Sequence, residues 1–156
     1  MNHETYLQRA IELAVEGVKS GTGGPFGAVI VKDGTILAEA QNNVTTSNDP
    51  TAHAEVTAIR KACEAIGDYQ LSDCILYTSC EPCPMCLGAI YWARPKEVYF
   101  ASQHSDAASA GFDDSYIYEE ITKHQSERKI PFYKIEVTDK LKPFQTWVNT
   151  EQKIEY

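Results

Sequence analysis

The first part of the chain carries apolar residues at the spacing of an α-helix. Within residues 5–19, Leu7, Ile11 and Val18 lie near the spacing that places side chains on one helix face. A glycine-rich stretch over residues 20–25 follows them. The pattern predicts an amphipathic helix over residues 5–19 that ends before this stretch.

A β-hairpin is predicted directly after the glycine-rich stretch. Residues 26–32 form a largely apolar run, and residues 35–40 continue as a second run of strand character. Asp33-Gly34 lies between them, and this pair favours the tight turn of a hairpin. We therefore expect two adjacent antiparallel strands joined at Asp33-Gly34.

Farther along, helix and strand patterns alternate. The expected helices cover residues 52–66, closed by Gly67, and a segment from Pro82 to about Trp92, and the expected strands cover residues 74–79 and 97–101. This order predicts an α/β layered domain in which helices cover a sheet. The tail is expected to hold helices over residues 107–110, 115–123 and 144–149, and a strand over residues 130–137.

The composition indicates one globular domain over residues 1–156. The hydrophobic fraction of 43% is ordinary, and a chain of 156 residues buries enough surface to fold without disulfides. Five cysteines are an odd number, and two of them form a Cys-x-x-Cys, which favours metal binding in a reducing compartment. We expect a cytoplasmic protein without a membrane partner, because the sequence shows neither a secretory signal nor an apolar run of about 20 residues.

The charge balance bears on possible partners. Fourteen Lys and Arg against 22 Asp and Glu give a net charge of −8. Nucleic-acid affinity depends largely on Lys and Arg at phosphates, and the sequence contains no run of these residues. We therefore expect no nucleic-acid partner and favour a small, uncharged substrate.

Two short motifs carry metal-binding chemistry. His53-Ala54-Glu55 lies at the start of one predicted helix, and Pro82-Cys83-Pro84-Met85-Cys86 at the start of the next, with Cys83 thirty positions after His53 (83 − 53). Both sulfurs face one way on a helix, and the positive helix N-terminus favours thiolates. A catalytic zinc site uses nitrogen and sulfur ligands and keeps a position for water. We expect His53, Cys83 and Cys86 to hold one zinc ion whose fourth ligand is water or hydroxide.

Glu55 is the candidate for proton transfer. It stands two positions after His53, on another side of the helix, so that it can approach the metal-bound water without binding the metal. Zinc lowers the pKa of a bound water from about 15.7 to about 7. A carboxylate within hydrogen-bond reach of that water can then move protons during a hydrolysis.

Other interpretations stay open at this point. A Cys-x-x-Cys alone is typical of a structural zinc knuckle or a redox pair, and a zinc-stabilised module without enzymatic activity would use the metal only to join two helices. The joint presence of both motifs favours catalytic zinc. We expect the other cysteines to be packing or lining residues and the other histidines to be surface residues: Cys63, Cys74 and Cys80, and His3, His104 and His124.

On these motifs the chain resembles the cytidine-deaminase-like superfamily, and closely the bacterial guanine deaminases of that fold. The likeness extends over the whole chain and includes Gly24-Pro25-Phe26-Gly27-Ala28-Val29, Gln41-Asn42-Asn43, Thr51-Ala52-His53-Ala54-Glu55, Thr78-Ser79-Cys80-Glu81-Pro82-Cys83-Pro84-Met85-Cys86 and Gly111-Phe112-Asp113-Asp114-Ser115. It implies a three-layer α/β/α fold with a central mixed sheet and helices on both faces. It also implies zinc-dependent hydrolysis of guanine at C2, which gives xanthine and ammonia.

The resemblance further implies substrate-binding residues. Asn42 would donate to O6 and N7 of guanine, the Ala54 N–H would bind the base, and Asp114 would receive its N1–H and 2-amino group and help shuttle protons. The simpler roles are a turn residue for Asn42 and a helix N-cap for Asp114. The aromatic residues would wall or close the pocket, or belong to the core: Phe26, Trp92, Phe112 and Tyr156.

The same resemblance leads us to expect a homodimer. The segment over residues 105–156 would then cap the site or be exchanged between protomers. Two rivals share the zinc motif, a tRNA adenosine deaminase and a free pyrimidine-base deaminase. The negative charge speaks against the first of them, since an anticodon arm needs phosphate contacts.

Overall fold

The computed structural model describes residues 2–156 and divides the chain into two compact units, the first ending at Ser115 and the second spanning Tyr116–Tyr156. Each unit is described by itself. The elements, in chain order, are α1 (His3–Ser20), β1 (Gly27–Lys32), β2 (Thr35–Gln41), α2 (Val44–Ser47), α3 (Ala54–Ile66), β3 (Cys74–Cys80), α4 (Pro84–Ala93), β4 (Glu97–Ser102), α5 (His104–Ser109), α6 (Ser115–Thr122), the 3₁₀ helix η1 (Gln125–Glu127) and α7 (Lys142–Asn149).

The first unit is built on a mixed four-stranded sheet in the order β2-β1-β3-β4. β1 pairs antiparallel with β2 and with β3, whereas β3 and β4 are parallel. The predicted hairpin is confirmed: Asp33 and Gly34 both have positive φ, 50° and 76°, as a two-residue turn between twisted strands requires. The parallel pair needs a crossover, which α4 provides.

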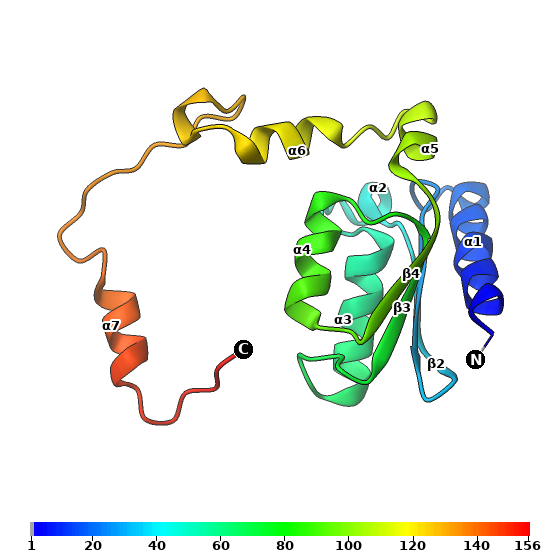
Figure 1. Cartoon of the computed structure of the whole chain (residues 1–156), viewed down its shortest axis with the longest axis horizontal. Helices are drawn as coiled ribbons and strands as arrows, with labels where there is room; N and C mark the ends of the chain where they lie inside the picture. Colours follow the sequence, from blue (N-terminus) through cyan, green and yellow to red (C-terminus); the bar gives the residue numbers. More distant parts are fainter. Residues whose placement is uncertain (1) are drawn as a thin grey trace. The chain divides into compact units, whose positions relative to one another are not determined.

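Helices cover both faces of the sheet (Figure 1). Ala28 and Ile30 of β1 pack on the side of α3 and α4, whereas Val29 and Val31 pack on the side of α1. Alternate residues point to opposite faces, so a strand between two helical layers must be apolar at nearly every position. This explains why the run over residues 26–32 does not alternate, and it confirms the predicted three-layer fold.

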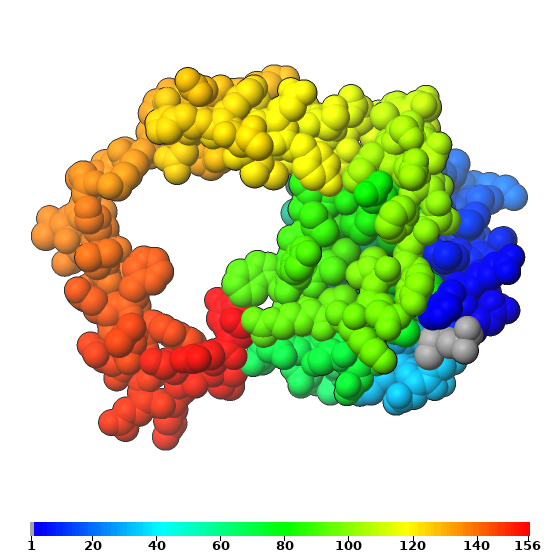
Figure 2. Space-filling model, viewed as in Figure 1, coloured from blue at the N-terminus to red at the C-terminus, as the bar shows by residue number. Residues whose placement is uncertain are grey.

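The packing of α1 on the sheet depends on Gly27. A Cβ at this position would lie 2.8 Å from the Ala14 backbone nitrogen and 2.9 Å from the Leu13 Cβ, with the Ala10 carbonyl oxygen nearer still. A backbone atom cannot rotate away as a flexible side chain can. Glycine at position 27 therefore sets how closely α1 approaches the start of β1. Phe26 lies in the loop that directly precedes this strand. Figure 2 shows the close packing of this unit, in blue to yellow-green.

Helix starts differ from the predictions in ways that matter for the site. The helix expected from Pro82 begins at Pro84, which occupies one of its first two positions, where its missing N–H costs no helical hydrogen bond. His53 and Cys83 are N-caps of α3 and α4 and do not lie in their first turns. The short helix α2 had no counterpart among the predicted elements. Across residues 2–156, every helix is too short or too polar to cross a membrane.

The second unit corrects one prediction. Its helices α6 and α7 match the expected segments within a few residues. The strand predicted over residues 130–137 is absent, although the stretch is described throughout and its apolar side chains, such as Ile130 and Ile135, are exposed. Backbone groups in a strand need a neighbouring strand as hydrogen-bond partner, and residues 116–156, all of them described, offer none.

Candidate active site

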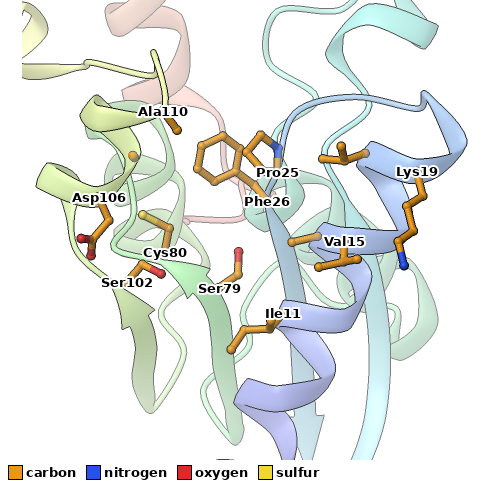
Figure 3. Close-up of a pocket in the computed structure, with 13 residues that line it drawn as sticks. Ile11, Val15, Lys19, Pro25, Phe26, Ser79, Cys80, Ser102, Asp106 and Ala110 are labelled. Atoms are coloured by element: carbon orange, nitrogen blue, oxygen red, sulfur yellow. The ribbon is translucent and has the colours of Figure 1, made fainter.

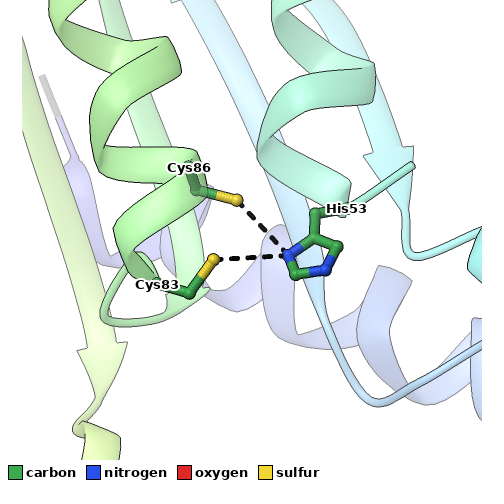
Figure 4. Close-up of side chains that lie close together, drawn as sticks. All are labelled: His53, Cys83 and Cys86. Carbon is green, nitrogen blue, oxygen red and sulfur yellow. Dashed lines mark hydrogen bonds between the residues drawn. The ribbon is translucent and has the colours of Figure 1, made fainter. Parts of the chain in front are cut away.

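Two helix N-termini on one side of the sheet bring the metal-binding side chains together. His53 caps α3, Cys83 caps α4, and Cys86 lies in the first turn of α4. The Sγ atoms of Cys83 and Cys86 each lie 3.5 Å from His53 Nδ1 (Figure 4). One ligand atom from each of these residues lies within 4.8 Å of the others. One nitrogen and two sulfurs form a donor set that fits zinc and leaves a position for water.

The two thiols have opposite acidities. The contacts with Cys86 and His53 outweigh burial and lower the pKa of Cys83 to about 4. The pKa of Cys86 is raised, because it is the hydrogen-bond partner of the Cys83 thiolate and is buried. A bound divalent cation would favour the thiolate form of both sulfurs.

Glu55 is a buried carboxylate beside this donor set. Its side chain is only 4% exposed, and burial is the main reason that its pKa is raised. The Thr78 hydroxyl donates to Oε1 at 3.1 Å, and the Cys86 thiol donates to Oε2 at 3.4 Å. A carboxylate with a raised pKa, next to a place where water can bind, can accept a proton and give it back.

Asn42 lies in the loop after β2 and is also buried. Its Oδ1 accepts hydrogen bonds from the backbone N–H of Gly24 at 3.1 Å and of Val44 at 3.3 Å. This use of the oxygen fixes the orientation of the amide and leaves Nδ2 as a donor. The Asn43 N–H donates to the Ala52 carbonyl at 2.9 Å and so ties the loop to the segment before His53.

The loop between α5 and α6 holds Phe112 and Asp114. The Phe112 ring meets the Phe26 ring edge-on, with centroids 5.1 Å apart and planes at 89°. Asp114 Oδ2 lies 3.4 Å from His104 Nδ1, and the side chain is 18% exposed. Both roles considered for Asp114 stay predictions: it directly precedes the first residue of α6, and its neighbour Asp113 accepts the Ser115 N–H at Oδ1 at 2.9 Å.

Residues 1–102 match the family of the cytidine and deoxycytidylate deaminase zinc-binding region. The chain belongs to this deaminase family. It is 72% identical to the guanine deaminase of Bacillus subtilis over 156 residues, the full length of both chains. The X-ray structure of guanine deaminase from Bacillus subtilis covers 100% of this chain and 99% of its own, with a TM-score of 0.98. The resemblance to bacterial guanine deaminases is thereby confirmed.

Other relatives are less similar. The tRNA-specific adenosine deaminase of Bacillus subtilis is 37% identical over 124 residues, 80% of this chain and 76% of its own. The structure of guanine deaminase from Nitrosomonas europaea is 30% identical, covers 71% of this chain and 64% of its own, and has a TM-score of 0.68. Relatives of much lower sequence identity thus share the fold over about three quarters of the chain.

Three further residues of this deaminase stay predictions as substrate contacts. Ala54 is the first residue of α3, so its N–H has no partner within the helix. Trp92 lies near the end of α4 with 63% of its surface exposed. Tyr156 belongs to the second unit and is exposed.

Two of the histidines expected at the surface are engaged within the fold. His3 Nδ1 lies 2.9 Å from the Tyr77 hydroxyl, and the His3 ring stacks on Tyr99. His104 lies between two carboxylates: besides Asp114, Glu81 Oε1 lies 3.6 Å from its Nε2. Sequence reasoning missed His104 because its partners are distant in the sequence or lie across a loop. The signal available in the sequence was the position of His104 between Glu81 and the Asp113-Asp114 pair.

An apolar hollow of about 450 Å³ lies near α1 and α5 (Figure 3). Its lining includes Ile11 and Val15 of α1, Phe26, and Cys80 at the end of β3, but none of the three metal-binding residues. Burial is the main reason that the pKa of Cys80 is raised to about 11. A protonated thiol is a poor nucleophile and metal ligand, and the role of Cys80 as a lining residue of the metal site stays a prediction.

Proposed function

We propose that this chain hydrolyses guanine to xanthine and ammonia. The observation that carries the proposal is the buried Glu55 carboxylate beside a nitrogen and two sulfurs, in a chain 72% identical over its full length to a guanine deaminase. His53, Cys83 and Cys86 would hold one zinc ion and leave its fourth position to water. When bound, zinc supplies the Lewis acidity that makes water a nucleophile at neutral pH.

Glu55 moves the protons of the reaction. It takes a proton from the attacking water and delivers it to a ring nitrogen as oxygen adds to C2. It then helps the exocyclic amine leave as ammonia, so that the C2–N bond breaks as the C2–O double bond forms. Its burial favours the uptake of a proton, because the cost of holding a charge in an apolar place raises the pKa of its carboxyl.

The base is held by its edges. Guanine presents acceptors at O6 and N7, which the Asn42 Nδ2 donor matches, because Asn42 Oδ1 is occupied by two backbone N–H groups. The N1–H and 2-amino groups are donors, and the Asp114 carboxylate accepts them. The Ala54 N–H is a further donor to the base, and Phe26 and Phe112 supply apolar contact.

The test is ammonia release from a panel of guanine, adenine, cytosine and their nucleosides, together with tRNA, before and after removal and return of zinc. We expect activity on guanine that is lost and regained with the metal. Glu55→Gln should keep zinc and fold and lower kcat by about 10²–10⁴-fold, the usual contribution of a general acid–base group. Glu39→Gln is the matched control, because Glu39 is paired with Arg9 on the outer face. Turnover of adenosine in tRNA, but not of guanine, would favour the rival suggested by the 37% identical relative.

We also propose a cytoplasmic homodimer in which the segment over residues 105–156 caps the site or is exchanged between protomers. All five cysteines are free thiols, as a reducing compartment allows. The described helices α6 and α7 contain no buried residue. A segment of this size cannot bury enough apolar surface alone, which favours a partner surface on a second copy. Removal of residues 138–156 should lower the mass in solution from that of a dimer to that of a monomer, and it should also lower the activity. A truncated protein that is still an active dimer would contradict the proposal.

A further inference from the structure

The two adjacent aspartates before α6, Asp113 and Asp114, make different contacts. Asp113 accepts the Ser115 N–H. Hydrogen bonding with the Ser115 side chain, and then with its N–H, holds the pKa of Asp113 below its usual range. Asp114 lies within reach of His104 and is more enclosed, with 18% of its side chain exposed. The first aspartate therefore shapes the start of the helix, while the orientation of the second is set by what surrounds its carboxylate.

His104 connects the Asp114 loop to the metal-binding segment. Its Nδ1 lies 3.4 Å from Asp114 Oδ2, and its Nε2 lies 3.6 Å from Glu81 Oε1. Glu81 immediately precedes Pro82-Cys83, and its N–H donates to the Ser102 carbonyl at 2.8 Å, which fixes it at the end of β4. The imidazole thus spans two segments whose separation decides how far Asp114 stands from the donor set.

The backbone of the same loop has a separate anchor. The Phe112 N–H donates to the Ala107 carbonyl at 3.0 Å, and the Phe112 ring rests on Phe26. Gly24 makes room for that ring, since a Cβ there would lie 3.2 Å from Phe112 Cε1. These contacts hold the loop but leave the Asp114 side chain free to rotate about its own bonds. The contact that directs its carboxylate is the one with His104.

We propose that His104 is the positioning residue of Asp114. It holds the Asp114 carboxylate in the orientation that accepts the N1–H and 2-amino group of guanine. It also keeps these groups at a fixed distance from the metal-binding segment. The inference rests on the proposed deamination of guanine and adds a residue that does not itself touch the substrate. Asp114 Oδ2 lies within reach of His104 Nδ1, and when that nitrogen carries the proton it can donate to the carboxylate in a charge-assisted hydrogen bond, which has both strength and direction.

The experiment compares His104→Ala, His104→Asn and the control Ser105→Ala, an exposed neighbour on α5. For His104→Ala we expect kcat/KM for guanine to fall about tenfold, mainly through KM, with zinc content unchanged. Asparagine can place an N–H near the position of Nδ1, so His104→Asn should recover most of the loss. A role in folding alone would not be rescued in this way.

A double-mutant cycle with Asp114→Ala decides the mechanism. If His104 acts through Asp114, His104→Ala should have little further effect on kcat/KM once Asp114 is replaced. Independent, multiplying losses would overturn the inference, as would an unchanged kcat/KM in His104→Ala. Failure of the unmodified, zinc-loaded protein to release ammonia from guanine would overturn the proposed function as well, so the two failures are distinguishable.

Discussion

Gly23 sets how closely the glycine-rich loop approaches Asn42. A Cβ at Gly23 would lie 2.5 Å from Asn42 Oδ1 and 2.8 Å from the Asn42 carbonyl carbon, with the carbonyl oxygen nearer still. An ordinary contact is at least 3.4 Å, so Gly23→Ala must move one of the two segments by roughly 1 Å. Because two of the crowded atoms are backbone, the change displaces the whole of Asn42, the residue proposed to donate to the base.

The expected magnitude follows from the hydrogen bond at risk. A neutral hydrogen bond contributes about 0.5–1.5 kcal/mol, and about 1.4 kcal/mol is a factor of ten in an equilibrium constant. Gly23→Ala should therefore raise KM for guanine about two- to tenfold. The crowding should also cost about 1–3 kcal/mol of the free energy of unfolding, which a domain stable by about 5–15 kcal/mol survives.

The assay measures ammonia release against guanine concentration, with thermal unfolding recorded alongside. Gly88→Ala is the matched control, because a Cβ there meets nothing within 4 Å on the exposed side of α4. It should leave KM unchanged and raise stability slightly, since alanine suits a helix better than glycine by about 0.5–1 kcal/mol. An unchanged KM in Gly23→Ala would refute the reasoning that the loop fixes Asn42.

Three further outcomes are expected. Gly27→Ala should lower the free energy of unfolding by about 3 kcal/mol in denaturant titrations, because its Cβ would strike the backbone of α1 at Ala10; a free energy of unfolding equal to that of the unmodified protein would contradict this. Arg9 lowers the pKa of Glu39 below its ordinary value of 4.5, so the pair stabilises the fold above that pH and less as the pH falls. Glu39→Gln should therefore cost about 0.2–1 kcal/mol at neutral pH and almost nothing in acid, whereas a pH-independent difference would exclude the pair as its cause. Cys83→Ser should lose zinc and ammonia release together in metal analysis and activity assays, since a hydroxyl is a poor zinc ligand; a full complement of zinc in this variant would remove Cys83 from the donor set.

The sequence by itself determined the layered fold and the candidate metal ligands. Local patterns carry this information: a run such as residues 26–32 can be apolar on both faces only if helices cover both sides of the strand, and Asp33-Gly34 favours a tight turn. His53, Cys83 and Cys86 were recognisable because the ligands sit in two short motifs at predicted helix starts. Glu55 followed from its place beside His53 in the first of these motifs.

Only the tertiary structure decided the contacts between distant segments. The expected strand over residues 130–137 does not form, because strand pairing depends on a neighbour that the pattern of one segment cannot supply. His104 was expected at the surface, yet it lies between Glu81 and Asp114, and the free donor of Asn42 became clear only from its bonds to Gly24 and Val44. Such roles arise from folding, which brings together groups whose spacing along the chain carries no signal of their meeting.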